Sequence, residues 1–180
     1  MKIFLTGKDG QVGLALHKKL VFLGEVIATD RHELNLENTD AIRAFIEKIK
    51  PDIIINAAAY TSVDKAESEI ELVDKVNTEA PRVLAEKASQ LDIPMIHFST
   101  DYVFDGLKNE PYMETDQVNP QSVYGQTKWD GEEAVRNHKK HIILRTSWLF
   151  SSRGQNFVKT ILKLIQEKTS LDVVSDQEGT

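Results

Sequence analysis

The sequence contains no cysteine, which excludes disulfide bonds and metal sites built from thiolates. It also lacks an apolar run approaching the roughly 20 residues of a membrane span, and its start, MKIFLTG, predicts a first strand rather than a signal peptide. An excess of positive charge is missing too. The 22 Lys and Arg against 28 Asp and Glu give a net charge of −6, whereas a general nucleic-acid binder needs a basic face. These absences favour a cytoplasmic enzyme or binding protein with no nucleic-acid or membrane partner.

Short apolar runs alternate with helical patterns along the 180 residues. The runs are rich in Ile, Val or Phe and too short for helices, so they predict six buried strands, at residues 3–5, 26–28, 53–55, 95–98, 142–144 and 171–174. Apolar residues at helical spacing predict five helices, at residues 12–23, 42–49, 78–91, 123–137 and 156–168. This alternation predicts an α/β fold of Rossmann type, a doubly wound parallel sheet with helices on both faces. The polar stretch 106–119 is expected to form a long functional loop over the carboxyl ends of the strands.

Three glycines follow the first predicted strand, in the stretch FLTGKDGQVG. Gly7, Gly10 and Gly13 would permit a tight turn and bring backbone N–H groups to a pyrophosphate at the start of the next helix. Asp30 follows the second strand, where a carboxylate accepts hydrogen bonds from the ribose hydroxyls of an adenosine. This combination predicts a nucleotide site rather than a simple connecting turn. Asp30 favours NADH, while Arg31 would accommodate the 2′-phosphate of NADPH, so both cofactors remain open.

Two further strand ends carry small or polar residues. Residues 56–61, NAAAYT, follow the third strand and would leave room for a ligand at the edge where doubly wound sheets bind them. An alanine-rich turn packed under a helix is the alternative there. Ser99, Thr100 and Asp101 end the next strand, where hydroxyl groups would either bond a substrate oxygen or only cap a helix.

Tyr124 and Lys128 lie four residues apart in SVYGQTKWDGE, on one face of a predicted helix. A free phenol has a pKa near 10, and a nearby ammonium would lower it toward the working pH of a proton donor. An isolated pair of this kind is usually an exposed Tyr and Lys on a solvated surface. Together with the glycine loop, Asp30 and Thr100, the pair predicts an acid–base site.

These motifs resemble the extended short-chain dehydrogenase/reductase family, in which a glycine loop, a Ser/Thr strand end and a Tyr-x-x-x-Lys pair follow in that order. Within it, the chain is similar to the dTDP-4-dehydrorhamnose reductase family. The phrases that carry this likeness span nearly the whole chain: GQVG, INAAAYTSVDKAE, STDYVFDG, NPQSVYGQTKWDGE, LRTSWLF and NFVKTIL.

The resemblance implies reduction of the C4 ketone of dTDP-4-dehydro-L-rhamnose by NADH or NADPH, giving dTDP-L-rhamnose. Tyr124 would protonate the developing alkoxide, Lys128 would hold the nicotinamide ribose and lower the Tyr124 pKa, and Thr100 would bond the reacting oxygen. Asp101 and Trp148 match positions that contact the substrate. The residues implied around the cofactor are Gly7, Gly10, Gln11, Val12, Gly13, Asp30, Asn35, Leu36, Ala58, Ala59, Tyr60 and Thr61. Asn35 stands where the family usually has Asp, and no metal is implied.

The resemblance also implies a longer protein, because the family continues into a nucleotide-sugar lobe beyond the end of this sequence. Residues 1–180 are therefore expected to form an NAD(P)-binding Rossmann domain that carries the catalytic residues, with the substrate domain largely absent and reduction weak or lost. A homodimer is a further expectation. The alternatives are a nucleotide-sugar epimerase or dehydratase of the same fold, a non-catalytic regulatory subunit, or a simple nucleotide-binding module.

Overall fold

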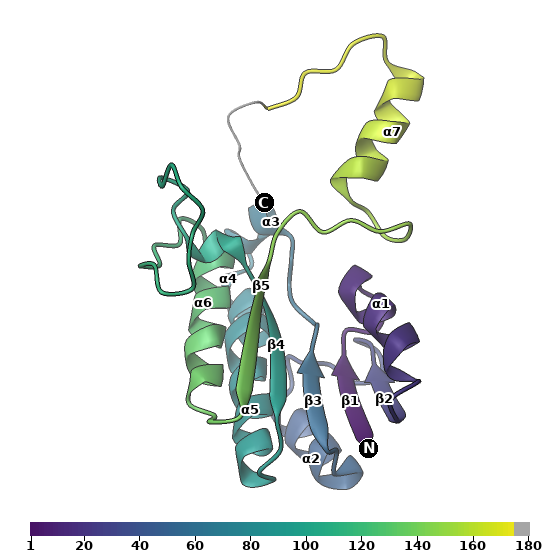
Figure 1. Cartoon of the computed structure of the whole chain (residues 1–180), viewed down its shortest axis with the longest axis vertical. Helices are drawn as coiled ribbons and strands as arrows, with labels where there is room; N and C mark the ends of the chain where they lie inside the picture. The colour runs from purple at the N-terminus through teal and green to yellow at the C-terminus, as the bar shows by residue number, and fades with distance from the viewer. Residues whose placement is uncertain (175–180) are drawn as a thin grey trace.

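A single parallel sheet forms the centre of the computed structural model, which describes residues 1–174 (Figure 1). Its strands run in the order β2-β1-β3-β4-β5. The bounds are Lys2–Thr6 for β1, Glu25–Thr29 for β2, Ile53–Asn56 for β3, Met95–Thr100 for β4 and His141–Thr146 for β5. Because all pairings are parallel, the five carboxyl ends share one edge. The strand order reverses between β1 and β3, which is where doubly wound sheets bind their ligands.

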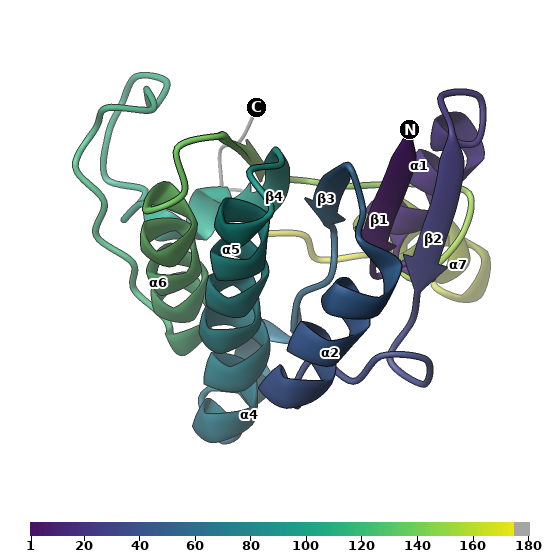
Figure 2. The same cartoon turned by 90° about the horizontal axis from the view of Figure 1, so that it is seen from below.

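Helices cover both faces of the sheet, as the sequence predicts (Figure 2). The helices α2 (Thr39–Ile49), α5 (Ala80–Gln90) and α6 (Val123–Arg136) lie on one face, and α1 (Gln11–Leu20) lies on the other. Side chains of β1 alternate between the two: Phe4 joins the core with α2 and α5, whereas Ile3 and Leu5 pack with Leu16 and Leu20 of α1. Burial of both faces explains why β1, β3 and β4 appear as continuous apolar runs, whereas the edge strand β5 leaves Ile142 and Leu144 exposed.

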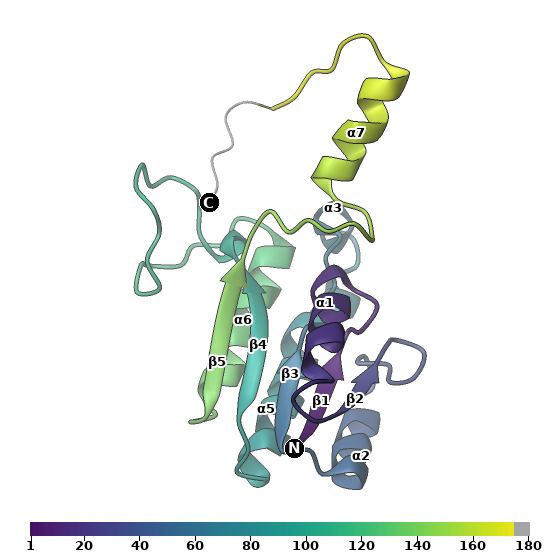
Figure 3. The same ribbon diagram turned by 45° about the vertical axis from the view of Figure 1, so that its right-hand side comes forward.

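Five of the six predicted strands are confirmed, and the sixth is wrong. Residues 171–174 have no regular secondary structure, and Val173 and Val174 are exposed. A strand needs a neighbouring backbone to pair with, and this run follows α7 (Phe157–Glu167), which lies beyond the carboxyl ends of the strands in two views (Figures 1 and 3). The apolar pattern alone therefore does not make a strand at this place.

The helix predicted over residues 78–91 begins earlier. A helical path starts with α4 (Ile70–Asp74), passes through one π-helical turn, η1 (Lys75–Glu79), and continues as α5. Pro81 lies at the start of α5 rather than opening a separate helix. The wider π turn accommodates a residue that has no backbone N–H to donate.

The remaining predicted helices end close to their expected positions, except at the end of α1. That helix stops at Leu20, and residues 21–23 form a turn in which Phe22 is exposed. Two short elements were not predicted: α3 (Val63–Ala66) and the 3₁₀ turn η2 (Asp101–Val103). The stretch 106–119 is an irregular loop, as expected, and projects beside α6 (Figure 1). No helix within residues 1–174 is long and apolar enough to cross a membrane.

Candidate functional site

The glycine loop joins β1 to α1 in a conformation that excludes side chains. Gly7 has a φ of 71°, and a Cβ added to it would lie 2.8 Å from the backbone nitrogen of Ala58. A Cβ on Gly13 would lie 1.9 Å from the carbonyl oxygen of Gly7. Both positions therefore require glycine. The start of α1 at Gly10 has no side-chain cap in the described chain, so its first N–H groups offer a positive end to an anion.

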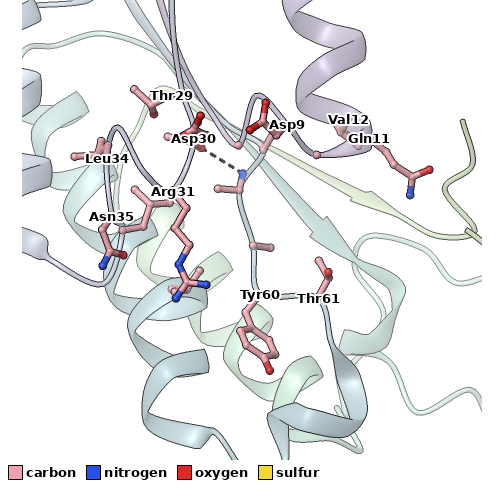
Figure 4. Close-up of a pocket in the computed structure, with 18 of the residues that line it drawn as sticks. Asp9, Gln11, Val12, Thr29, Asp30, Arg31, Leu34, Asn35, Tyr60 and Thr61 are labelled. Atoms are coloured by element: carbon pink, nitrogen blue, oxygen red, sulfur yellow. Dashed lines mark hydrogen bonds between the residues drawn. The ribbon is translucent and has the colours of Figure 1, made fainter. Parts of the chain in front are cut away.

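A cavity of about 520 Å³ opens beside this loop, at the carboxyl ends of β1, β2 and β3 (Figure 4). It lies at the reversal of strand order between β1 and β3. The predicted cofactor residues that line it are Gly7, Gly10, Gln11, Val12, Asp30, Asn35, Leu36, Ala58, Ala59, Tyr60 and Thr61. Gly13 is buried beneath the loop instead. The catalytic candidates do not line this cavity.

The sequence did not single out several other lining residues. Leu34, Leu72 and Val76 contribute apolar surface, and Leu149, Gly154 and Gln155 come from a distant loop. None of them belongs to a recognisable nucleotide motif, so no sequence signal pointed to them.

Asp30 is held in place before any ligand arrives. Its Oδ1 accepts hydrogen bonds from the backbone N–H groups of His32 and Glu33, at 2.8 and 3.0 Å. Lys8 lies 3.4 Å from its other oxygen. The Glu33 N–H, followed by the His32 N–H and Lys8, holds the Asp30 pKa below its usual value against the effect of desolvation. Asp30 is therefore an ionised acceptor at the end of β2, and Lys8 offsets part of its charge.

Arg31 stands next to Asp30 at the cavity wall (Figure 4). Its guanidinium pairs with Glu37 at 2.9 Å and remains largely exposed. The Asn35 side chain, which stands where the family usually has Asp, accepts the backbone N–H of Glu37 at 3.0 Å and thereby stabilises the turn at residues 35–37. The cavity thus offers both an anion and a cation beside the end of β2, in keeping with the two cofactors that the sequence leaves open.

Buried polar side chains connect the carboxyl ends of three strands. Thr6 donates to Asn56 at 2.6 Å, and the Asn56 amide contacts Nδ1 of His97 at 3.0 Å. The backbone N–H of Ala58 also donates to Thr6, at 3.3 Å. Burial, and then the charge of Lys128, lower the His97 pKa well below its usual value, so this imidazole is neutral. The polar contacts fix the start of the alanine turn that forms the cavity wall.

The three catalytic candidates meet at the carboxyl end of β4. Thr100 ends that strand, and α6 carries Tyr124 and Lys128 against it. Lys128 is 2 % exposed, and its ammonium donates to the backbone oxygen of Phe98 at 2.6 Å. The residue next to Tyr124 has to be glycine, because a Cβ on Gly125 would lie 2.4 Å from the carbonyl oxygen of Tyr102. The glycine lets α6 approach the end of β4 closely.

The expected lowering of the Tyr124 pKa is not found; burial raises that pKa instead. An interaction with the Thr100 side chain lowers it, while the charges of Asp101 and Tyr102 raise it further. Lys128 does not act on the phenol here, because its ammonium is committed to a carbonyl oxygen and is itself buried. Desolvation lowers the pKa of Lys128 to about 8. The i, i+4 spacing alone therefore does not produce the acidic phenol that the sequence predicted.

Asn77 connects the cavity to the catalytic helix, and the sequence analysis missed it. This buried amide lies in the π turn η1. It accepts the backbone N–H of Tyr60 at 2.9 Å and donates to the backbone oxygen of Tyr60 at 3.1 Å. It also reaches the Thr127 hydroxyl, at 3.4 Å, between Tyr124 and Lys128. An asparagine on the apolar face of a helical stretch was the available signal, since a buried polar group needs partners.

The predicted substrate residues lie near the same edge but outside the cavity. Asp101 is exposed at the start of η2 and accepts a hydrogen bond from Thr100 at 3.1 Å. Trp148 follows β5, has a φ of 51° and is half-exposed. Its ring meets Phe157 edge-on, with centroids 6.0 Å apart. Trp148 therefore presents open aromatic surface and is not a buried strand-end residue.

Comparison with known proteins places this arrangement in a family. A family profile described as RmlD substrate binding domain matches residues 1–180. The chain belongs to the RmlD substrate binding domain family. A dTDP-4-dehydrorhamnose reductase of Shigella flexneri is 44% identical over an alignment of 184 positions that covers 99% of this chain and 62% of that protein. The family resemblance inferred from the motifs is thus confirmed.

Two solved structures support the fold at high similarity. A dTDP-4-dehydrorhamnose reductase of Clostridium acetobutylicum superimposes with a TM-score of 0.95 at 44% identity, over 98% of this chain and 64% of that one. A Bacillus anthracis dTDP-4-dehydrorhamnose reductase in complex with NADP gives 0.93 at 36% identity, over 98% and 63%. The Rossmann-type fold is confirmed, and the chain spans less than two thirds of the length of these relatives.

Proposed function

We propose that this protein reduces dTDP-4-dehydro-β-L-rhamnose to dTDP-β-L-rhamnose with NADH or NADPH, a step that supplies precursors of cell-surface polysaccharide. The observation that carries the proposal is the meeting of Thr100, Tyr124 and Lys128 at the sheet edge that also holds the glycine-lined cavity. Similarity to reductases along 99% of the chain supports it. Because the chain spans 62% of that relative, the activity is proposed for a protein that includes the remaining part.

The residues present fit a dinucleotide. Gly7 and Gly13 leave no room for a Cβ, so the backbone lies close to the cavity and would bring the N–H groups of α1 to a pyrophosphate. Asp30 would accept the hydroxyls of the adenosine ribose, and Ala58 with Ala59 would line the dinucleotide. Lys128 would hold the nicotinamide ribose. When bound, NADH or NADPH supplies the hydride that adds to the ketone carbon.

Tyr124 would transfer its phenolic proton to the carbonyl oxygen as that hydride adds. Tyr124 is partly buried beside Thr100, which would hydrogen-bond the same oxygen and orient it. The pKa of a free phenol is near 10, and burial raises that of Tyr124, so the phenol carries its proton at neutral pH. This state suits an acid, and the resulting phenolate would need a cation nearby before it recovers a proton from solvent.

Asp101 and Trp148 are proposed to contact the nucleotide sugar, because both lie beside Thr100 and β5 with exposed surface. We further infer that the protein acts in the cytoplasm as a homodimer and without a nucleic-acid partner. The net charge of −6 supports the last of these expectations. Light scattering of the purified protein tests the dimer directly.

A fluorescence titration with NADH and NADPH tests the cofactor part of the proposal on residues 1–180. We expect saturable binding of both dinucleotides in the micromolar range. An NADH-oxidation assay with the dTDP-keto-sugar tests the reaction, in a protein extended beyond residue 180 by the part that the relatives possess. Saturable binding without any sugar-dependent oxidation in the extended protein would overturn the reductase proposal and leave a nucleotide-binding role.

A further inference from the structure

The Gln11 side chain contacts a loop almost the whole length of the chain away. Its Oε1 accepts a hydrogen bond from the Asn156 amide at 3.1 Å and lies 3.2 Å from the Ser151 hydroxyl. Its amide donates to the backbone oxygen of Gln155 at 3.3 Å. All three partners belong to the loop of residues 149–156, which joins β5 to α7. Figure 4 shows Gln11 on the side of the cavity away from Asp30 and Arg31.

The 149–156 loop forms part of the cofactor cavity. Leu149, Gly154 and Gln155 line it together with the glycine loop. The two ends of the loop are held together by the edge-on contact of Trp148 with Phe157, so the loop is closed at its base. Such compact loops carry much of the binding function in α/β proteins.

The contact between Gln11 and this loop is close at the backbone level as well. Gly154 has a φ of 72°, and a Cβ there would lie 3.2 Å from Cγ of Gln11. Asn156 also accepts the Lys159 N–H at 3.1 Å and thereby caps α7. One side chain thus caps α7 and contacts the first residue of α1.

We infer that Gln11 is a positioning residue whose side chain holds the 149–156 loop against the pyrophosphate end of the cofactor cavity. The inference rests on the proposed dinucleotide site and deepens it. The backbone N–H of Gln11 would serve the pyrophosphate, while its side chain fixes the loop that forms the neighbouring wall. Cofactor binding and the placement of Trp148 and α7 are coupled through this one side chain.

The loop carries its own probe, because trypsin cleaves after Arg153, which is exposed. We expect Gln11→Ala to raise the cleavage rate at Arg153 about three- to tenfold in the cofactor-free chain, as one or two lost hydrogen bonds would. Peptide mass spectrometry measures that rate against cleavage after Lys139, which lies at the far end of α6. Gln90→Ala, at the exposed end of α5, is the matched control and should leave the ratio unchanged.

Asn156→Asp separates the contact with Gln11 from the helix cap. The carboxylate keeps an acceptor for the Lys159 N–H but loses the amide that donates both to Gln11 and, at 2.9 Å, to the backbone oxygen of Ser151. It should therefore raise cleavage at Arg153 at least as much as Gln11→Ala does, and the double variant should add little to Asn156→Asp alone. Equal cleavage in wild type and both variants would overturn the inference, as would fully additive effects.

Saturating NADH provides the second readout. In the wild type, it should slow cleavage at Arg153 at least fivefold, and in Gln11→Ala less than twofold. Stopped-flow fluorescence should show NADH dissociation accelerated about fivefold in Gln11→Ala, with the association rate within twofold of wild type. Equal protection and equal dissociation in the two proteins would overturn the coupling. A wild type that fails to bind NADH at all overturns the proposed function and the coupling, while the cofactor-free cleavage ratio still decides whether Gln11 positions the loop.

Discussion

The burial of the Lys128 ammonium can be tested through the stability of the protein alone. Desolvation lowers its pKa from 10.5 to about 8, so at neutral pH the native state holds a charge that it disfavours by about 3 kcal/mol. Lys128→Met removes this charge but also the hydrogen bond to the Phe98 oxygen, which is worth about 1 kcal/mol. We expect the cofactor-free variant to be more stable than the wild type by about 2 kcal/mol at pH 7.

Urea unfolding followed by tryptophan fluorescence measures this difference, and its pH dependence identifies the cause. Because the native pKa is the lower one, the penalty is fully present below pH 8 and disappears between pH 8 and 10.5, as native Lys128 loses its proton first. The wild type should gain about 1.4 kcal/mol on the variant between pH 7 and pH 9. Lys139→Met replaces an exposed lysine just beyond the end of α6 and should show neither effect. A variant that is less stable at pH 7, with a difference that is flat to pH 9, would refute the reasoning.

Three other substitutions test the cavity, with Gly106→Ala as the control for the first. Gly13→Ala should destabilise the chain by more than about 2 kcal/mol in urea unfolding and abolish NADH binding, because its Cβ would lie 1.9 Å from the Gly7 oxygen. Gly106→Ala, which meets no atom within 4 Å, should lose only about 1 kcal/mol. Asp30→Ala should weaken the binding of NADH about tenfold and that of NADPH less, as titrations with both would show; an unchanged ratio of the two affinities would contradict the proposed contact of Asp30 with the ribose. Asn77→Ala should lower turnover more than cofactor affinity, since it holds Tyr60 against Thr127; equal losses would contradict that link.

Local patterns were sufficient to predict most of the fold. The strands β1, β3 and β4 are largely buried on both faces, and β5 packs one face against the core while Ile142 and Leu144 stay exposed on the other; each still appears in the sequence as an apolar run. The start of α2 follows the same local logic, because Asn38 caps the helix by accepting the Ala41 N–H. The strand predicted over residues 171–174 does not form, because pairing depends on a neighbouring strand, which no local pattern reveals. The glycine loop and Asp30 were found because backbone geometry at a strand end limits the residue type.

The rest of the site depends on contacts between distant parts of the chain. Asn77 and the 149–156 loop reach the cavity through folding, and neither carries a motif. The direction of the Tyr124 pKa depends on burial and on where the Lys128 ammonium points. Spacing of four residues determines that two side chains share a helix face, but not that they interact.

Tyr124 is proposed as the proton donor of an NAD(P)H-dependent reductase. The most direct measurement compares the wild type with Tyr124→Phe, both extended beyond residue 180, in NADH oxidation with dTDP-4-dehydrorhamnose at saturating cofactor. We expect sugar-dependent turnover in the wild type and a loss of at least about a hundredfold in the variant, with NADH affinity within threefold. Near-normal turnover of Tyr124→Phe would contradict it.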